Sequence, residues 1–144
     1  MTRLLAVLKS AGIALVYAVL AYTLCQTVNV CLWEPFLHWH GGDNVDAAVL
    51  FHYYYYIFME FITALVAFLA GRSYRPFFQV EGVLAGAAAA VAFRLFEQEQ
   101  WMRRMMSADD TFFEAAFLGV VFGLVGSVSS RSGLRRQKRE PRTS

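Results

Sequence analysis

Residues 10–33 read SAGIALVYAVLAYTLCQTVNVCLW and contain no charged side chain. A helix needs about 20 consecutive apolar residues to cross a bilayer, so this stretch is long enough to span one. It is too long for the apolar core of a typical signal peptide, and no Ala-x-Ala cleavage site follows it. We therefore expect an uncleaved transmembrane helix and, with it, an all-α membrane protein.

Three further segments have a similar character: residues 47–71, 77–96 and 111–130. Together with the first, they predict four transmembrane helices packed as a bundle in one domain, residues 1–130. The remaining residues, 131–144, are basic and lack apolar periodicity. We expect this tail to be disordered.

The composition agrees with a membrane protein. Of 144 residues, 58% are hydrophobic and only 17% are charged, against about 45–50% and about 25% in soluble domains. A net charge of +2 is too small to indicate a nucleic-acid partner. No hydrolase, phosphate-loop or dinucleotide motif is present, so the sequence predicts neither an enzyme nor a cofactor. The lipid bilayer is the expected partner.

Basic residues predict the orientation. They gather in residues 1–9, 72–75 and 131–142, whereas residues 34–46 contain no Lys or Arg. Because cytoplasmic loops of membrane proteins carry an excess of Lys and Arg, both termini should be cytoplasmic. The segments 34–46 and 97–110 should then be the outer loops.

One carboxyl group stands out within the membrane. Glu60 lies near the middle of segment 47–71, where a charged carboxylate costs about 2.5–3.5 kcal/mol. His52, Tyr56 and Thr63 share its helix face. This candidate polar site either exchanges protons, binds a cation or ligand, or joins helices by a structural hydrogen bond. Counting residues from the segment ends places no basic side chain at the depth of Glu60, so we expect it to be unpaired with any cation of the chain and mostly protonated.

Other residues suggest structural roles. Arg94 and Glu114 lie near the outer ends of their segments, so we expect a structural ion pair between them. Small residues recur every fourth position in two series, Gly82/Gly86/Ala90 and Gly119/Gly123/Ser127. Such faces let helix backbones approach closely, either within the bundle or in a homo-oligomer. His38 and His40 do not predict a metal site, because no spacing fixes further ligands.

The order of several features resembles a known family. Residues 56–62 read YIFMEFI, Pro76 follows a short loop, and residues 90–95 read AVAFRL. A charged outer loop, a fourth apolar segment and an Arg-rich tail complete the order. This resembles the phosphate-starvation-inducible E (PsiE) family of small bacterial inner-membrane proteins, with Glu60, Pro76 and Arg94 as the matching positions. The resemblance implies a bacterial inner-membrane location and a link to phosphate limitation, without a defined activity.

Three functions are compatible with these patterns. The leading hypothesis is a non-enzymatic, PsiE-like membrane protein with a stress-response or accessory role. The first alternative is a small oligomeric proton-coupled transporter that uses Glu60. The second alternative is a membrane subunit of a redox complex, in which the aromatic residues and histidines lie near haem or quinone.

Overall fold

The computed structural model describes residues 2–39, 45–73, 79–98 and 108–137. These residues form four helices in chain order: α1 (Thr2–Trp39), α2 (Val45–Ser73), α3 (Gln79–Gln98) and α4 (Ala108–Gln137). The prediction of an all-helical chain is confirmed for this part of the sequence. His40 and Pro76, which the sequence analysis singled out, lie outside the described residues.

Three of the helices are long and apolar enough to cross a membrane. The qualifying stretches are Leu4–Trp39, Ala48–Ser73 and Thr111–Ser130. Many large apolar side chains on these helices are exposed, including Leu20, Phe61 and Phe117. A soluble protein rarely exposes such a continuous apolar surface, whereas lipid covers it at no cost. The chain is therefore a membrane protein. Helix α3, which contains many Ala and Gly residues, does not meet the same criterion.

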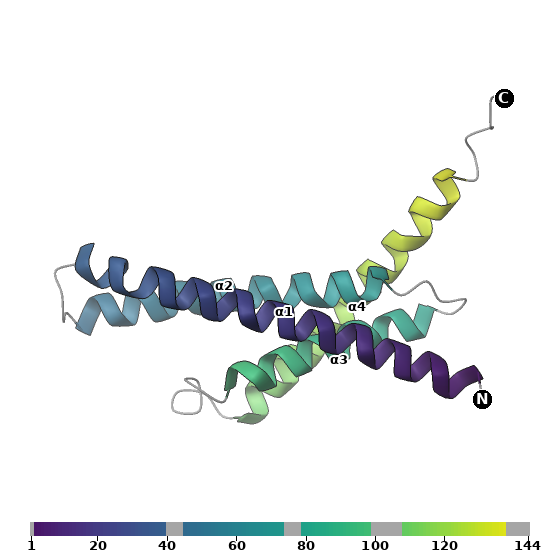
Figure 1. The fold of residues 1–144 in the computed structure, drawn as a ribbon, viewed down its shortest axis with the longest axis horizontal. Helices are drawn as coiled ribbons and strands as arrows, with labels where there is room; N and C mark the ends of the chain where they lie inside the picture. The colour runs from purple at the N-terminus through teal and green to yellow at the C-terminus, as the bar shows by residue number, and fades with distance from the viewer. Residues whose placement is uncertain (1, 40–44, 74–78, 99–107, 138–144) are drawn as a thin grey trace.

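The helices form two antiparallel pairs that cross each other (Figure 1). Helices α1 and α2 lie along one another, and α3 and α4 form the second pair. Both α2 and α3 pack against every other helix, whereas α1 and α4 contact each other only weakly. The start of α1, the end of α2, the start of α3 and the end of α4 all lie toward the same side of the molecule.

The interior of the molecule is built largely on small side chains. On α1, Ala14, Ala18, Ala21 and Cys25 form one buried stripe, while most other side chains of this helix are exposed. The spacing of these residues is that of a single helix face. The stripe belongs to a core that continues over apolar residues of α2 and α3, among them Met59, Ile62, Val66, Ala89 and Phe93.

The two series of small residues pack against each other within one chain. A Cβ on Gly86 would lie 2.5 Å from the Cα of Gly123 and 2.8 Å from the carbonyl oxygen of Ala67. A Cβ on Gly82 would lie 2.8 Å from the Cβ of Ser127. Only glycine permits such contacts between α2, α3 and α4. Because these faces are covered inside one chain, a homo-oligomer, which stays a prediction, would need another surface.

The helices extend beyond several predicted ends. Helix α1 continues to Trp39 and includes Pro35, although an outer loop is expected from residue 34. Near a helix end, proline removes only one hydrogen bond and the following turn can still form. Helix α4 includes residues 131–137, so the prediction of a disordered tail is wrong for that part. Adding a residue to an existing helix costs little, and the Arg, Leu and Gln residues of this stretch are good helix formers.

Candidate functional site

Three ionisable side chains from three helices meet at one place. Glu60 comes from the middle of α2, Arg94 from the last part of α3, and Glu114 from the first part of α4. Helices α3 and α4 run antiparallel (Figure 1), so the last part of α3 lies beside the first part of α4, where Arg94 and Glu114 are in contact. Because α2 packs against both helices, its central turns bring Glu60 to the same place.

Arg94 is the centre of this group. Its Nη2 forms an ion pair with Oε1 of Glu60 and lies 3.5 Å from Oε2 of Glu114. The Arg94 side chain is 3% exposed, compared with 23% for Glu60 and 34% for Glu114. The cation is thus buried, while its two acidic partners have some access to the surroundings.

Tyr56 completes the group from the turn of α2 that precedes Glu60. Its hydroxyl donates to both carboxyl oxygens of Glu114, at 2.9 and 3.0 Å. The guanidinium carbon of Arg94 lies 5.8 Å from the centre of the Tyr56 ring, within the range of a cation–π contact. Tyr56, Glu60, Arg94 and Glu114 are called the charge cluster below.

The charge cluster corrects one sequence-based expectation. Glu60 was expected to have no cation partner from its own chain, and Arg94 provides one. The expectation assumed that the middles of all the segments lie at the same depth. Instead, α1 and α2 extend well past the end of α3 and the start of α4 (Figure 1). The middle of α2 therefore lies beside the end of α3, and the reason for predicting a protonated Glu60 no longer holds.

Arg94 and Glu114 lie in contact, as their similar positions suggested. The structural role expected for this contact stays a prediction. Of the predicted polar face on α2, Tyr56 and Glu60 belong to the charge cluster. Thr63 is buried, and its hydroxyl donates to the carbonyl oxygen of Met59 on the same helix. The ring of His52 packs edge-on against Trp33 of α1 at 5.7 Å, so His52 faces another helix.

A second polar group escaped the sequence analysis. Glu97, expected at the start of an outer loop, lies in α3 and is only 6% exposed. Nε2 of Gln26 on α1 donates to its two carboxyl oxygens at 3.3 and 3.5 Å. The hydroxyl of Tyr55 on α2 lies beside the same carboxyl. Gln26, Tyr55 and Glu97 are called the Glu97 site below. The spacing of Arg94 and Glu97 is the signal that could have found it, because residues three apart share a helix face.

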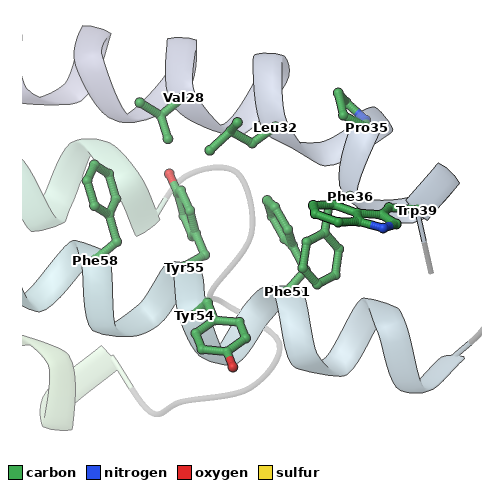
Figure 2. Close-up of a pocket in the computed structure, with 9 residues that line it drawn as sticks. All are labelled: Val28, Leu32, Pro35, Phe36, Trp39, Phe51, Tyr54, Tyr55 and Phe58. Carbon is green, nitrogen blue, oxygen red and sulfur yellow. The ribbon is translucent and has the colours of Figure 1, made fainter.

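An apolar groove lies between α1 and α2 (Figure 2). It has a volume of about 530 Å³, and its lining residues are Val28, Leu32, Pro35, Phe36, Trp39, Phe51, Tyr54, Tyr55 and Phe58. Figure 2 shows the Tyr55 hydroxyl pointing from α2 toward α1, whereas the Tyr54 ring points away from α1. The lining offers apolar contact and almost no polar groups, so the ionisable chemistry of the molecule lies at the charge cluster and the Glu97 site.

Among the described residues, no group of three or more His, Cys, Asp and Glu side chains could hold a metal ion. Of the two cysteines, Cys25 is buried and Cys31 is exposed. The comparisons with known proteins give no identity, because no family model, curated protein or solved structure matches this chain. The function must therefore be argued from the site itself.

Proposed function

We propose that this chain is a four-span protein of the bacterial inner membrane that moves protons through the charge cluster, without catalysing a covalent reaction. The observation that carries the proposal is a buried arginine shared by two acidic side chains from two other helices. Ionisable groups within transmembrane segments are functional candidates by default, because their burial is costly.

Helix α3 is the fourth span in this proposal. Its 20 residues correspond to about 30 Å of helix, the thickness of the hydrocarbon core. Its modest hydropathy is compatible with this position because it packs against all three other helices. A helix largely covered by protein needs few large apolar side chains, and small residues let its neighbours approach.

The proposed orientation has both termini in the cytoplasm. Basic residues gather in 1–9, 72–75 and 131–142, and the helix ends that adjoin these segments lie toward one side of the molecule. An excess of Lys and Arg on one side favours the cytoplasm for that side. The charge cluster then lies toward the outer ends of α3 and α4.

Proton exchange follows from the charge balance of the cluster. If Glu60 and Glu114 are both ionised, two negative charges face the single positive charge of Arg94. A net charge in a poorly solvated place is unfavourable, and the uptake of one proton removes it. Because both carboxyl groups share Arg94, they titrate as a pair. Glu114 is the more exposed acid and lies close to the start of the apolar stretch of α4, so it is the entry point for protons from outside.

Proton flux into liposomes tests this function. The wild-type protein, reconstituted with a pH-sensitive dye inside the vesicles, should let protons follow an imposed gradient. Glu60→Gln should abolish the flux, because the cluster then holds one acid for one cation and has no proton to exchange. Glu34→Gln is the matched control, since Glu34 is an exposed acid on α1. Flux equal to that of empty liposomes, or full flux in Glu60→Gln, would contradict the proposal.

A second candidate is the PsiE-like accessory role in the response to phosphate limitation. One observation favours it: two of the positions that match the family, Glu60 and Arg94, form an ion pair across α2 and α3. In this case the pair fixes the helix arrangement and exchanges no proton. Expression of the gene should then rise when phosphate is limiting, and the liposomes should remain tight to protons.

A further inference from the structure

The Glu97 site lies on the same face of α3 as the charge cluster. Glu97 follows Arg94 by three residues, so both side chains point into the protein and both are buried. Their charges interact with each other. The two neighbouring helices that complete the site are α1, through Gln26, and α2, through Tyr55. No ion pair joins Arg94 and Glu97 directly among the described residues.

Two buried donors next to this site lack a protein partner. Among the described residues, Arg94 Nε and Arg94 Nη1 are buried without a hydrogen bond, and the buried hydroxyl of Tyr55 lies beside the Glu97 carboxyl. Leaving such a donor unsatisfied costs about 1–3 kcal/mol, and more for a charged group. The side chains of Arg94 and Tyr55 both interact electrostatically with Glu97, whose carboxyl receives long hydrogen bonds from Gln26.

A water molecule satisfies such a set of groups. Buried waters typically make two to four hydrogen bonds to polar groups that have no other partner. The free N–H groups of Arg94 donate to the water oxygen, and the water donates to the Glu97 carboxylate. The hydroxyl of Tyr55 can donate to the water oxygen or to the Glu97 carboxylate. An anion fits less well, because a carboxylate already occupies one side of the site, and a cation fits less well because Arg94 occupies the other.

We propose that a bound water molecule bridges Arg94 to Glu97 and Tyr55, and that Glu97 is a third carboxyl group sharing the charge of Arg94. The second part rests on the proton exchange proposed above. The positive charge of Arg94 is then shared by Glu60 and Glu114 on one side and by Glu97 on the other. Through Gln26, the site also ties α1 to the charge cluster.

The coupling has a defined direction. An ionised Glu97 draws part of the Arg94 charge away from Glu60 and Glu114. Replacing Glu97 by Gln releases Arg94 to these two carboxylates and stabilises their ionised forms. The cluster should then take up its proton at a lower pH than in the wild type. The other ionisable groups facing this region are Tyr22 and Cys25 of α1, Tyr55 and Tyr56 of α2, and Glu114 of α4.

Infrared pH-difference spectroscopy in nanodiscs tests the proposal. Spectra of the wild type recorded in H₂¹⁶O and H₂¹⁸O should contain an isotope-sensitive water band. Glu97→Gln should remove this band and lower the midpoint pH of the cluster's carboxyl band by at least half a pH unit. Tyr55→Phe, which removes one hydroxyl, should shift the water band. Tyr54→Phe is the matched control, because Tyr54 is the adjacent and exposed tyrosine, and should change nothing.

The outcomes separate this proposal from the proposed function. A wild-type spectrum without a water band would overturn the proposal, as would a water band or a midpoint that Glu97→Gln leaves unchanged. Far-ultraviolet circular dichroism verifies that each variant is folded. If Glu97→Gln does not fold, Tyr55→Phe decides the outcome, and an unshifted water band counts against the proposal. Tight liposomes combined with a wild-type water band and both Glu97→Gln effects would refute proton transport and leave the bridging water and shared charge supported.

Discussion

Arg94 holds the charge cluster together because of its shape as well as its charge. The guanidinium group is planar and presents several N–H donors in fixed directions. Its Nη2 contacts both Glu60 and Glu114, while the guanidinium plane lies over the Tyr56 ring. A lysine ammonium is a compact point charge that lacks this plane and the further N–H donors. Arg94 is thus the one side chain that contacts every other member of the charge cluster.

Double-mutant cycles measure how Arg94 is shared. Arg94→Ala should destabilise the protein by about 3 kcal/mol, because it leaves the partly buried carboxylate of Glu60 without its cation. Adding Glu60→Ala should recover more of this loss than adding Glu114→Ala. Glu114 lies farther from Arg94, is more exposed and keeps a hydrogen bond from Tyr56. SDS-induced unfolding in mixed micelles provides the free energies. Additive effects in both cycles would mean that these residues do not interact.

The charge cluster was partly predictable from the sequence. Glu60 stood out because it lies within an apolar segment, and the similar positions of Arg94 and Glu114 suggested their contact. The pairing of Glu60 with Arg94 was not predictable from depth counting, because the offset between α2 and α3 depends on how the helices cross. Glu97 was missed because its position at a segment end resembles a loop, although Arg94 on the same face marks it as buried.

At the scale of elements, glycine determines how closely α2, α3 and α4 approach. Gly86 of α3 lies against the backbones of Gly123 and Ala67, which leaves no room for a side chain. This close contact also sets the position of Arg94, two turns farther along α3. The packing of the small-residue faces and the geometry of the charge cluster are therefore parts of one arrangement.

Adding a single methyl group tests this close packing. Gly86→Ala should lower the free energy of unfolding by about 1–3 kcal/mol, because the new Cβ overlaps backbone atoms that cannot move aside. Gly12→Ala is the matched control, since a Cβ on Gly12 of α1 meets nothing within 4 Å. This change should be neutral or stabilising by up to about 1 kcal/mol, because alanine favours helix. Equal effects of both substitutions would contradict the packing.

The recurrence of small residues predicted which faces pack closely. It could not predict whether the partner is another helix or another chain, because both need the same short side chains. Helix ends were the least predictable feature. The prediction ended the first span at residue 33 and the fourth at residue 130, whereas α1 ends at Trp39 and α4 at Gln137. A helix can continue into polar residues beyond its apolar stretch, so the end of the apolar stretch does not fix the end of the helix.

At the scale of the whole molecule, the two helix pairs differ in length and exposure. Helices α1 and α2 extend beyond α3 and α4 on the side away from the N-terminus (Figure 1). This extension contains aromatic residues of the groove, among them Phe36, Trp39 and Phe51. Trp and Tyr side chains favour the interface between lipid and water, so Trp39 at the end of α1 suits a membrane surface.

Reporter fusions test the proposed topology. Alkaline phosphatase fused after residue 42 or 103 should be active, because both sites are predicted to lie outside. Green fluorescent protein fused after residue 144 should fluoresce, because the C-terminus is predicted to lie in the cytoplasm. An active phosphatase fused after residue 76 would contradict the topology, since that link carries Arg72 and Arg75 and is predicted to lie inside.

The central claim, that the charge cluster exchanges a proton, is tested most directly by measuring proton uptake. The purified protein in nanodiscs is acidified, and the protons that it binds are counted with a pH indicator. Over a pH range in which exposed carboxyl groups stay ionised, we expect the wild type to take up one more proton than Glu60→Gln or Glu114→Gln. Glu34→Gln, which lacks only an exposed carboxyl group, should take up as many protons as the wild type. Identical uptake by the wild type and both cluster variants over this pH range would contradict the claim.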